Sequence, residues 1–503
     1  MKWNELTRYW DMDETLKEKL ADLNIKGIAY DSRKVEKDYL FVAIEGYKTD
    51  GHSFVGSALE KGASCVVVEK DRYSEFRNTS FADKIIPIEN TRKALALCSK
   101  AFFNNPDSKM KVIGVTGTNG KTSITYMVRE IALAAGEKCG VIGTIACYVG
   151  DKKTKTANTT PESFEIYRLM SEMVEAGCRV CVMEVSSHAL VLNRVEGMDF
   201  DVVIFTNLSE DHLDFHKDMQ DYLNAKMLII PALLKSNKKE KIALLNSNSS
   251  VFNDFQIYAQ KLHAPHRTYG IKNNSFYSAE NIQMTRESNS FDVKLGDTHS
   301  HFHLGLLGDF NISNALSVIG AMDFLGYPAE MIVSGLEKVS VPGRFQNVPT
   351  TLPFTVIVDY AHTDDALHNV LMTMRKLNPR RILCLFGCGG DRETGKRYLM
   401  GEISGKYADL TFITSDNPRT EDPERILDMI EEGVRRVNGK YLRILNREQA
   451  IERVIEEAGE NDLVLIAGKG HEDYQILKDR TIHFDDTETA EKYLRKREKS
   501  EQK

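Results

Sequence analysis

A glycine-rich segment, GVTGTNGKTS at residues 114–123, has the residue types that bind phosphate groups. The apolar run before it predicts a strand, and KTSITYMVREIALAAG at its end predicts a helix. At such a turn backbone N–H groups face an anion, Lys121 can reach terminal phosphates, and Thr122 can coordinate Mg²⁺. The first glycine of the strict motif would fall at Val115, but a plain tight turn does not explain Lys121 and Thr122 in register. We therefore predict that ATP binds the loop made of Gly117, Thr118, Asn119, Gly120, Lys121, Thr122 and Ser123.

A carboxylate and an imidazole follow other predicted strands of the same region. Glu184 lies in the run RVCVMEV, and His212 lies in EDHLD, after the next strand, DVVIFTNL. Both side chains can reach the phosphate loop, and this pair beside a triphosphate suits Mg²⁺ or Mn²⁺. His212 alone is more typical of a hydrogen-bonded loop histidine, so a metal role depends on its neighbours.

Polar turns end four predicted strands in the last third of the chain: FTVIVDYAH, RILCLFGCGG, DLTFIT and DLVLIAGKG. Open α/β sheets bind ligands at the carboxyl ends of their strands, so these turns are expected to meet at one edge. Two guanidinium groups can hold a carboxylate and a glutamate can pair with an ammonium, which together suit an α-amino acid. The alternative is a set of surface salt bridges. The candidate residues are Arg392, Asp416, Asn417, Pro418, Arg419, Gly468 and Glu472.

The length of 503 residues is too great for one hydrophobic core, and about three domains are expected. We predict an α/β protein with a small N-terminal α/β domain at residues 1–108 and a central domain at 109–340. The central domain is expected to be P-loop NTPase-like, with a mostly parallel sheet and crossover helices. A Rossmann-like domain is predicted at 341–503, and it begins with the hinge-like VPGRF segment.

The composition is that of an ordinary globular protein, with a net charge of −7 that calls for neither nucleic acid nor an anionic membrane. The first residues have no apolar core of a signal peptide, and no run is long enough to span a membrane, so we expect a cytoplasmic protein. The eight cysteines are expected to be buried thiols, without disulfides or metal. The charged end RKREKSEQK is predicted to be solvated and frayed, and the protein is expected to be a monomer.

Further segments follow in a fixed order: NTTPE, MEVSSHAL, FTNLSEDHLDFH, YLNAK, GDFNISNAL, PGRF, VDYAH, GGDRETGKR, DNPR and GKGHEDYQ. Together with GTNGKTS, and with DSRKVEKDYLFVAIEG near the start, they resemble the Mur ligase family over essentially the whole chain. These are ATP-dependent amide ligases that build the peptidoglycan stem peptide. The motifs are most similar to those of members that add a diamino acid to UDP-N-acetylmuramoyl-L-alanyl-D-glutamate.

The resemblance implies roles that the residues alone do not. It implies catalytic roles for Lys121, Glu184, His212 and Lys226, with Lys226 carbamylated so that it binds the second of two Mg²⁺ ions. The metal-binding side chains would be Thr122, Glu184, His212 and the Lys226 carbamate. It also implies nucleotide contacts for Asn311, Arg344 and Asp359, although Asn311 and Asn314 alone are typical of helix N-caps.

The muramoyl dipeptide site is implied in the same way. Its candidate residues are Ser32, Asn158, Thr159, Thr160, Ser186 and Arg194. The threonines alone are equally typical of turn caps. Two departures bear on this site, since relatives commonly have Gln at Leu192 and often Pro-Gly at Glu36 and Lys37.

The implied reaction activates the D-glutamyl γ-carboxylate as an acyl phosphate, which the amine of the diamino acid then attacks. DNPR resembles the members that add meso-diaminopimelate, whose distal carboxylate Arg419 can bind. L-Lysine or another diamino acid stays open, as does a folylpolyglutamate-synthetase-like or secondary-metabolite ligase. A nucleotide-binding regulatory module without turnover is the alternative from another class.

Overall fold

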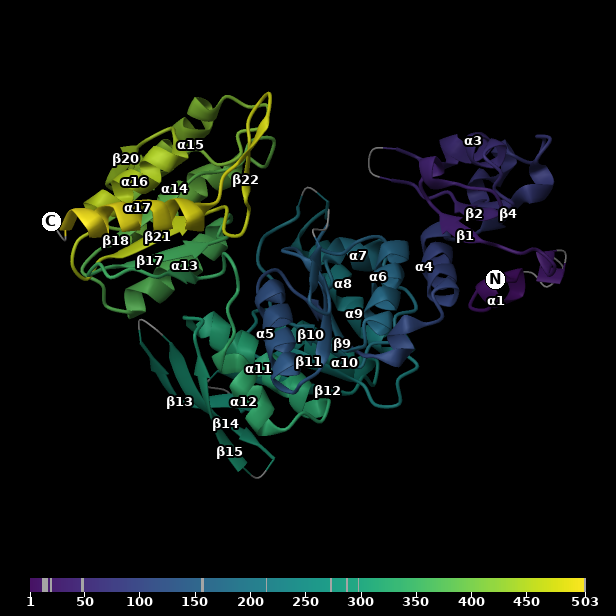
Figure 1. Cartoon of the computed structure of the whole chain (residues 1–503), viewed down its shortest axis with the longest axis horizontal. Coiled ribbons are helices and arrows are strands. Elements are labelled where there is room, and N and C mark those ends of the chain that lie inside the picture. The colour runs from purple at the N-terminus through teal and green to yellow at the C-terminus, as the bar shows by residue number, and fades with distance from the viewer. Residues whose placement is uncertain are drawn as a thin grey trace.

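The computed structural model describes residues 1–10, 17–18, 20–46, 49–154, 158–213, 215–271, 274–285, 288–296 and 298–501. Its strands form three large sheets in three successive parts of the chain, and a small two-stranded ribbon (Figure 1). Mostly parallel sheets covered by helices make a three-domain α/β fold, as predicted.

The N-terminal sheet has four parallel strands in the order β1-β2-β3-β4. Its elements are β1 (Gly27–Ala29), β2 (Tyr39–Val42), α3 (Val55–Glu60), β3 (Cys65–Glu69), β4 (Ile85–Ile88) and α4 (Thr91–Phe102), after the short α1 (Trp3–Leu6). Separate apolar clusters cover the two faces of the sheet, which explains why its strands are short runs of apolar residues. Helix α4 packs against α6 (Ser163–Glu175) of the central domain.

The central sheet has eleven strands in the order β15-β14-β13-β12-β11-β10-β5-β9-β6-β7-β8. Its parallel core contains β5 (Lys111–Thr116), β6 (Lys138–Ile142), β9 (Cys178–Glu184), β10 (Val202–Phe205), β11 (Ile242–Asn246) and β12 (His266–Ile271). One face is covered by α5 (Lys121–Ala134), α11 (Asp309–Phe324) and α12 (Ala329–Glu337). The other is covered by α6, α7 (Ser187–Val191), α8 (Met219–Met227), α9 (Ile229–Lys235) and α10 (Phe252–Lys261).

Antiparallel pairs at both ends of this sheet were not predicted. They are formed by β7 (Cys147–Val149) and β8 (Lys152–Thr154) at one end, and by β13 (Tyr277–Met284), β14 (Asn289–Leu295) and β15 (Thr298–Leu304) at the other. β14 alternates between buried and more exposed residues, so its apolar signal is half that of a central strand.

The C-terminal sheet has the order β16-β17-β21-β18-β19-β20, and only β16 is antiparallel. Its strands are β16 (Gln346–Val348), β17 (Thr355–Asp359), β18 (Ile382–Phe386), β19 (Leu410–Ile413), β20 (Tyr441–Arg443) and β21 (Leu463–Ala467). Helices α13 (Asp364–Lys376), α14 (Gly395–Tyr407) and α15 (Pro423–Arg436) cover one face, and α16 (Arg447–Glu457) and α17 (Asp486–Glu501) the other. The four strands that precede the polar turns are parallel, so those turns share one edge.

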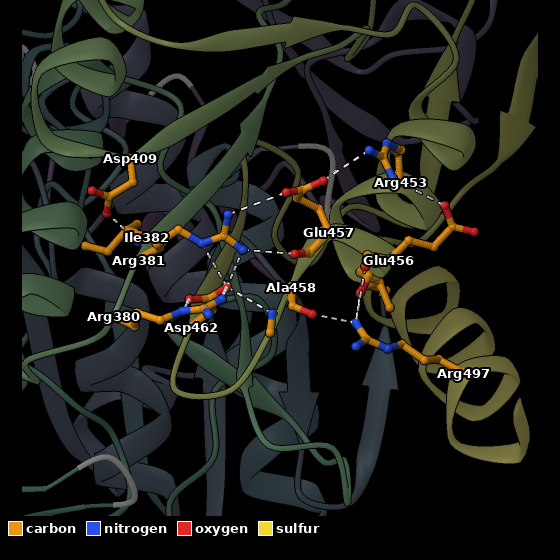
Figure 2. Close-up of polar contacts among 12 residues, drawn as sticks. Arg380, Arg381, Ile382, Asp409, Arg453, Glu456, Glu457, Ala458, Asp462 and Arg497 are labelled. Atoms are coloured by element: carbon orange, nitrogen blue, oxygen red, sulfur yellow. Dashed lines mark hydrogen bonds and ion pairs between the residues drawn. The ribbon is translucent and has the colours of Figure 1, made fainter. Parts of the chain in front are cut away.

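The charged end of the chain is not frayed up to residue 501, contrary to the prediction, because it is the last part of α17. Arg497 Nη1 donates to the carbonyl oxygen of Ala458 at 2.6 Å (Figure 2). Glu498 accepts a hydrogen bond from the backbone N–H of Thr351 at 2.8 Å. These contacts fasten the helix to the sheet edge opposite the polar turns.

Two remaining predictions concern the whole chain. All eight cysteines lie in the described residues, and each is a free, buried thiol, as predicted. Within the described ranges, the helices are too short or too polar to cross a membrane.

Candidate functional site

The phosphate loop between β5 and α5 is built by two glycines in the left-handed region, Gly117 (φ 145°) and Gly120 (φ 92°). A Cβ atom at Gly117 would collide with the Thr206 hydroxyl, so the loop requires glycine there. Lys121, the first residue of α5, donates from Nζ to the carbonyl oxygens of Gly117 and Thr118, both at 2.8 Å. Burial lowers the pKa of Lys121. The ammonium is therefore held over the loop where an anion would lie.

Glu184, at the end of β9, is completely buried beside this loop. It accepts hydrogen bonds from Thr122 Oγ1 at 3.0 Å, and from the Thr144 backbone N–H and Oγ1 at 2.9 and 3.1 Å. The Thr122 hydroxyl and the Glu184 carboxylate are hard oxygen donors, and they fit Mg²⁺, which takes few protein ligands besides phosphate and water. No three His, Cys, Asp or Glu side chains of the described ranges are grouped to hold a metal ion.

Lys226 and His212 lie around Tyr222 of α8. Lys226 is 1% exposed, and its Nζ lies 4.3 Å from the centre of the Tyr222 ring. Burial, helped by the charge of Lys121, lowers the pKa of Lys226 well below its usual value. The Tyr222 hydroxyl is 3.2 Å from Thr118 Oγ1, which ties α8 to the phosphate loop. His212 adopts φ 57°, and its ring centre lies 6.0 Å from that of Tyr222.

A cleft of about 1630 Å³ lies between the three domains. The predicted site residues that line it are Asn158, Thr159, Thr160, Ser186, Arg194, His212, Arg392, Asp416, Asn417, Arg419, Gly468 and Glu472. Ser32 does not line the cleft. It begins a short 3-10 helix, and its carbonyl oxygen accepts a hydrogen bond from Lys61 Nζ. Pro418 is also outside the lining. The cleft thus joins the predicted dipeptide and amino-acid residues across two domains.

The dipeptide side of the cleft is held by hydrogen bonds among its own residues. Thr160 Oγ1 donates to the Glu184 carbonyl oxygen at 2.8 Å, and Ser186 Oγ caps α7 through the Ala189 N–H at 3.2 Å. Arg194 Nη1 donates to the Thr160 carbonyl oxygen at 2.9 Å. Thr160 and Ser186 therefore shape the turn, as the turn-cap alternative predicts, and they also line the cleft, so their contact with the dipeptide stays a prediction.

Glu162, the last residue of NTTPE, was missed as a site residue. Its Oε2 lies 2.8 Å from Arg92 Nη1 of the N-terminal domain and 3.4 Å from Arg194 Nε. All three side chains line the cleft. Of the two departures from the pattern of relatives, Leu192 lines the cleft. Glu36 and Lys37 lie just before the first residue of β2 and are not among the lining residues.

Asn311 and Asn314 lie inside α11, whose N-cap is Gly308, so the N-cap interpretation is wrong. Asn311 is 1% exposed and donates to the Leu307 carbonyl oxygen at 2.9 Å. A Cβ atom at Gly120 would collide with the Asn314 amide, so α11 packs directly against the phosphate loop.

Arg344 and Asp359 lie together where the chain enters the C-terminal domain. The Arg344 guanidinium is 4.5 Å from the centre of the Tyr360 ring. Asp359 accepts from the Phe345 and Ala361 N–H groups at 2.6 and 2.8 Å. Burial raises the pKa of Asp359, and the charge of Arg344 opposes that rise.

The DNPR turn forms one wall of the cleft. Asn417 Oδ1 accepts from the Ile476 N–H at 2.9 Å, which directs Nδ2 to Glu472 Oε2, also at 2.9 Å. Arg419 Nη1 donates to the Gly390 carbonyl oxygen at 2.6 Å. Burial and then the charge of Asp416 raise the pKa of Glu472. Arginine, amide and carboxylate are thus presented on one wall.

Two buried cations behind this wall were not identified from the sequence. Lys469 is completely buried, and its Nζ lies among Asn417, Glu472 and Asp416. Arg447 is buried against Asp486, with two contacts of 2.7 Å, and donates to the Ala467 carbonyl oxygen at 2.9 Å. The only sequence signal for Lys469 is its place between two glycines in GKGHE.

Family models match three stretches of the chain. They are described as the Mur ligase family catalytic domain at residues 24–103, the Mur ligase middle domain at 115–322, and the Mur ligase glutamate ligase domain at 343–470. Together they cover the phosphate loop, the NTTPE segment and the DNPR turn.

Relatives match almost the full length. A protein of Clostridium tetani (strain Massachusetts / E88), named UDP-N-acetylmuramoyl-L-alanyl-D-glutamate--2,6-diaminopimelate ligase, is 43% identical over 482 residues, which are 94% of this chain and 95% of the relative. A protein of the same name from Clostridioides difficile (strain 630) is 41% identical over 99% of this chain and its own full length. A solved structure with that name superposes with a TM-score of 0.71 at 28% identity, covering 99% of both chains.

Proposed function

Because the chain belongs to the Mur ligase family, whose members are ATP-dependent ligases, we propose that it adds meso-diaminopimelate to UDP-N-acetylmuramoyl-L-alanyl-D-glutamate. The product would be a cytoplasmic precursor of peptidoglycan. The observation that carries the proposal is the cleft, which faces the phosphate-loop domain on one side and the Asn417, Arg419 and Glu472 wall on the other. Relatives more than 40% identical that bear this substrate in their names support it.

Each part of the chain would bring one reactant. Residues 1–108 would hold the uridine nucleotide, with Ser32 among its contacts. Residues 109–340 would hold ATP on the phosphate loop, and residues 341–503 would hold the amino acid. Asn119 of the loop lies 3.4 Å from Asp365 of α13, so the central and C-terminal domains meet beside the phosphate loop. Since one chain supplies every group, a monomer suffices.

The first step would be phosphoryl transfer. A γ-carboxylate oxygen of the D-glutamyl residue attacks the γ-phosphorus of ATP, the bond to the bridging oxygen breaks, and ADP leaves. Lys121 would move from the carbonyl oxygens of Gly117 and Thr118 to the transferring phosphoryl group and offset its charge.

Other residues would position the two substrates. Thr160 and Arg194 would orient the dipeptide, while Asn311, Arg344 and Asp359 would contact the nucleotide.

Thr122, Glu184, His212 and carbamylated Lys226 would hold two Mg²⁺ ions, which supply positive charge beside the phosphates. Carbamylation needs a neutral amine, and the lowered pKa of buried Lys226 favours that form. The ammonium first loses a proton, and addition of CO₂ to the neutral Nζ forms an N–C bond and releases a second proton, so a cation becomes an anion. This change would put a carboxylate-like group near Lys121.

The second step would form the amide. An amine of the acceptor attacks the acyl-phosphate carbon, phosphate leaves, and the amine loses a proton. Water would hydrolyse the same intermediate, so closure of the three-domain cleft has a clear benefit. Arg392 and Arg419 would hold carboxylates of the acceptor, and Glu472 an ammonium.

Meso-diaminopimelate has a distal carboxylate that L-lysine lacks, and Arg419 offers it a guanidinium. Arg419 donates to the backbone oxygen of Gly390, so it can take a carboxylate without breaking an ion pair. A folylpolyglutamate-synthetase-like ligase would not need this wall together with Glu472. Lysine or another diamino acid is the second candidate, because the same wall would hold any acceptor with a terminal ammonium.

A ligation assay with a panel of acceptors tests the proposal. ADP release should require both the muramoyl dipeptide and meso-diaminopimelate, and mass spectrometry should find the tripeptide product. L-Lysine, D-alanine and L-glutamate serve as comparison acceptors. Equal use of L-lysine would reassign the acceptor, and ADP release without any amino acid, or none at all, would contradict the ligase.

A further inference from the structure

A buried ammonium lies behind the amino-acid wall. Lys469 follows β21 and is 0% exposed. Its Nζ lies 3.4 Å from Asn417 Oδ1, 3.5 Å from Glu472 Oε2 and 3.8 Å from Asp416 Oδ1. Asp416 and Asn417 come from the turn after β19, so Lys469 connects two loops that line the cleft.

The charges in this cluster do not cancel. Asp416 and Glu472 face a single ammonium, because the guanidinium of Arg447 is taken by Asp486 with contacts of 2.7 Å. Buried carboxylates are costly when they lack a counter-charge. One negative charge is therefore left over, and it matches one ammonium of an amino acid.

The contacts of Lys469 are also long for charge-assisted hydrogen bonds, which are ordinarily about 2.7–2.9 Å. A second cation can enter beside the ammonium without displacing it from a closed network. Asn417 holds the carboxylate of Glu472 from its other side at 2.9 Å. The carboxylate is thus fixed in direction and still open toward the cleft.

We propose that Lys469 is a positioning and specificity-determining residue, which offsets one of the two negative charges of Asp416 and Glu472 and leaves the other for one ammonium of the acceptor. The inference rests on the proposed function, because it assigns the wall to an amino acid. An acceptor with an ammonium near this wall is favoured, and one with a neutral or acidic group there is rejected.

The pH dependence of acceptor binding follows from the same cluster. The charged and titratable groups around Glu472 are Asp416, Lys469, Arg447, Tyr360 and Tyr474. Burial and Asp416 raise the pKa of Glu472, and Lys469 opposes them. Loss of the Lys469 charge therefore raises that pKa further, so a higher pH is needed to ionise the carboxylate.

The test compares Lys469→Met with the wild-type enzyme. We expect KM for meso-diaminopimelate to rise about tenfold or more, since one partner of a buried charge group is removed. KM for ATP and for the muramoyl dipeptide should stay within about twofold. The acid limb of kcat/KM for the amino acid should move to higher pH, which a merely structural residue would not cause.

Two controls separate the outcomes. Hydroxylamine in place of the amino acid traps the acyl phosphate as a hydroxamate, and its rate should be unchanged in Lys469→Met. Lys100→Met removes a buried ammonium between two carboxylates far from the wall, and it should leave KM for the amino acid unchanged. If Lys469→Met does not fold, Lys469→Gln removes the charge while keeping a hydrogen-bond donor.

A wild-type KM and pH profile in the Lys469 variants would overturn the proposal. An equal loss of kcat/KM for all three substrates, together with an equal loss of the hydroxamate rate, would also overturn the proposal, because it would assign Lys469 a purely structural role. A wild-type enzyme that forms neither hydroxamate nor tripeptide would instead contradict the proposed function.

Discussion

Two buried lysines, each between two carboxylates, differ in how tightly they are held. Lys100 of α4 lies at the junction of the N-terminal and central domains and is 2% exposed. Its Nζ contacts the Gly197 carbonyl oxygen at 2.6 Å, Asp199 at 2.7 Å and Asp107 at 2.9 Å. The nearest comparable contact of Lys469 is 3.4 Å.

We interpret the difference as one between a structural contact that joins two domains and the proposed amino-acid-binding wall. All three donors of the Lys100 ammonium have acceptors at ordinary hydrogen-bond distances, so the network is closed. Burial alone lowers the pKa of Lys100, but Asp107 and Asp199 outweigh it and the net shift is upward. The Lys469 cluster has similar charges at greater distances, beside a cleft that can admit a ligand.

The largest effect is expected at a third buried lysine, Lys226, which contacts a ring rather than an acid. Lys226→Ala should lower kcat by about a thousandfold, because the proposed carbamate ligand to Mg²⁺ is lost. Formate or acetate at high concentration should restore part of the activity. Steady-state ADP release measures both results.

Lys235→Ala is the matched control, because Lys235 is an exposed residue of the neighbouring helix α9 that pairs with Glu196. It should keep wild-type kcat. Full activity of Lys226→Ala without added acid would contradict the carbamate.

Lys100→Met should act on stability instead of on substrate affinity. Leaving Asp107 and Asp199 buried without their cation should cost about 3 kcal/mol. The midpoint of urea denaturation should fall, while the KM values of the folded enzyme stay within about twofold. A selective rise in KM for one substrate would show that the closed network has a binding role and would break the comparison.

Two arginines of the C-terminal domain differ in the same way. Arg447 forms a buried ion pair with Asp486, whereas Arg419 donates to a backbone oxygen. Arg419→Ala should lower kcat/KM for meso-diaminopimelate about thirtyfold, because the proposed bidentate contact with the distal carboxylate would be lost. The effect on L-lysine should be under about threefold. Arg425→Ala, an exposed position of α15, is the control. If Arg419→Ala spares diaminopimelate, the role assigned to this guanidinium is wrong.

The sequence predicted the elements whose signal is local. β5, β9 and β10 are nearly continuous apolar runs because both faces of the sheet are covered, and the polar turns of the C-terminal strands follow the same logic. β13 to β15 were missed because one face is exposed, as in THSHFHL. The loop glycines and Lys121 were predicted together because their spacing is local as well.

Charge relations across the fold could not be predicted in this way. Nothing in the local sequence distinguishes Lys469, because Asp416 is brought beside it only by the pairing of strands in the sheet that contains β19 and β21. Glu162 likewise pairs with Arg92, which belongs to another domain. Asn417 was predicted as a substrate contact, and in the structure its amide is directed by Ile476 toward Glu472.

The opposite edge of the C-terminal sheet offers a smaller, pH-dependent test. Asp462 is buried, and it accepts from Arg380 at 2.9 Å and from Arg381 at 2.7 Å (Figure 2). Although burial opposes it, hydrogen bonding to both arginines lowers the pKa of Asp462 to about 2. A lowered pKa gives stability that is present above the usual value near 4 and is lost as pH falls toward 2. Asp462→Asn should therefore cost about 1–2 kcal/mol at pH 7 and much less at pH 2.

Glu472 should behave in the opposite way, because its pKa is raised by burial and by Asp416. A raised carboxyl pKa makes the folded state bind more protons, so stability falls as pH rises from the usual value through the folded one. Glu472→Gln should then be neutral or stabilising at pH 7 while it weakens binding of the amino acid. Urea denaturation of both variants at pH 7 compares the two edges directly. Equal losses of stability in Glu472→Gln and Asp462→Asn would show that the carboxylate of the wall is held as tightly as the one at the opposite edge.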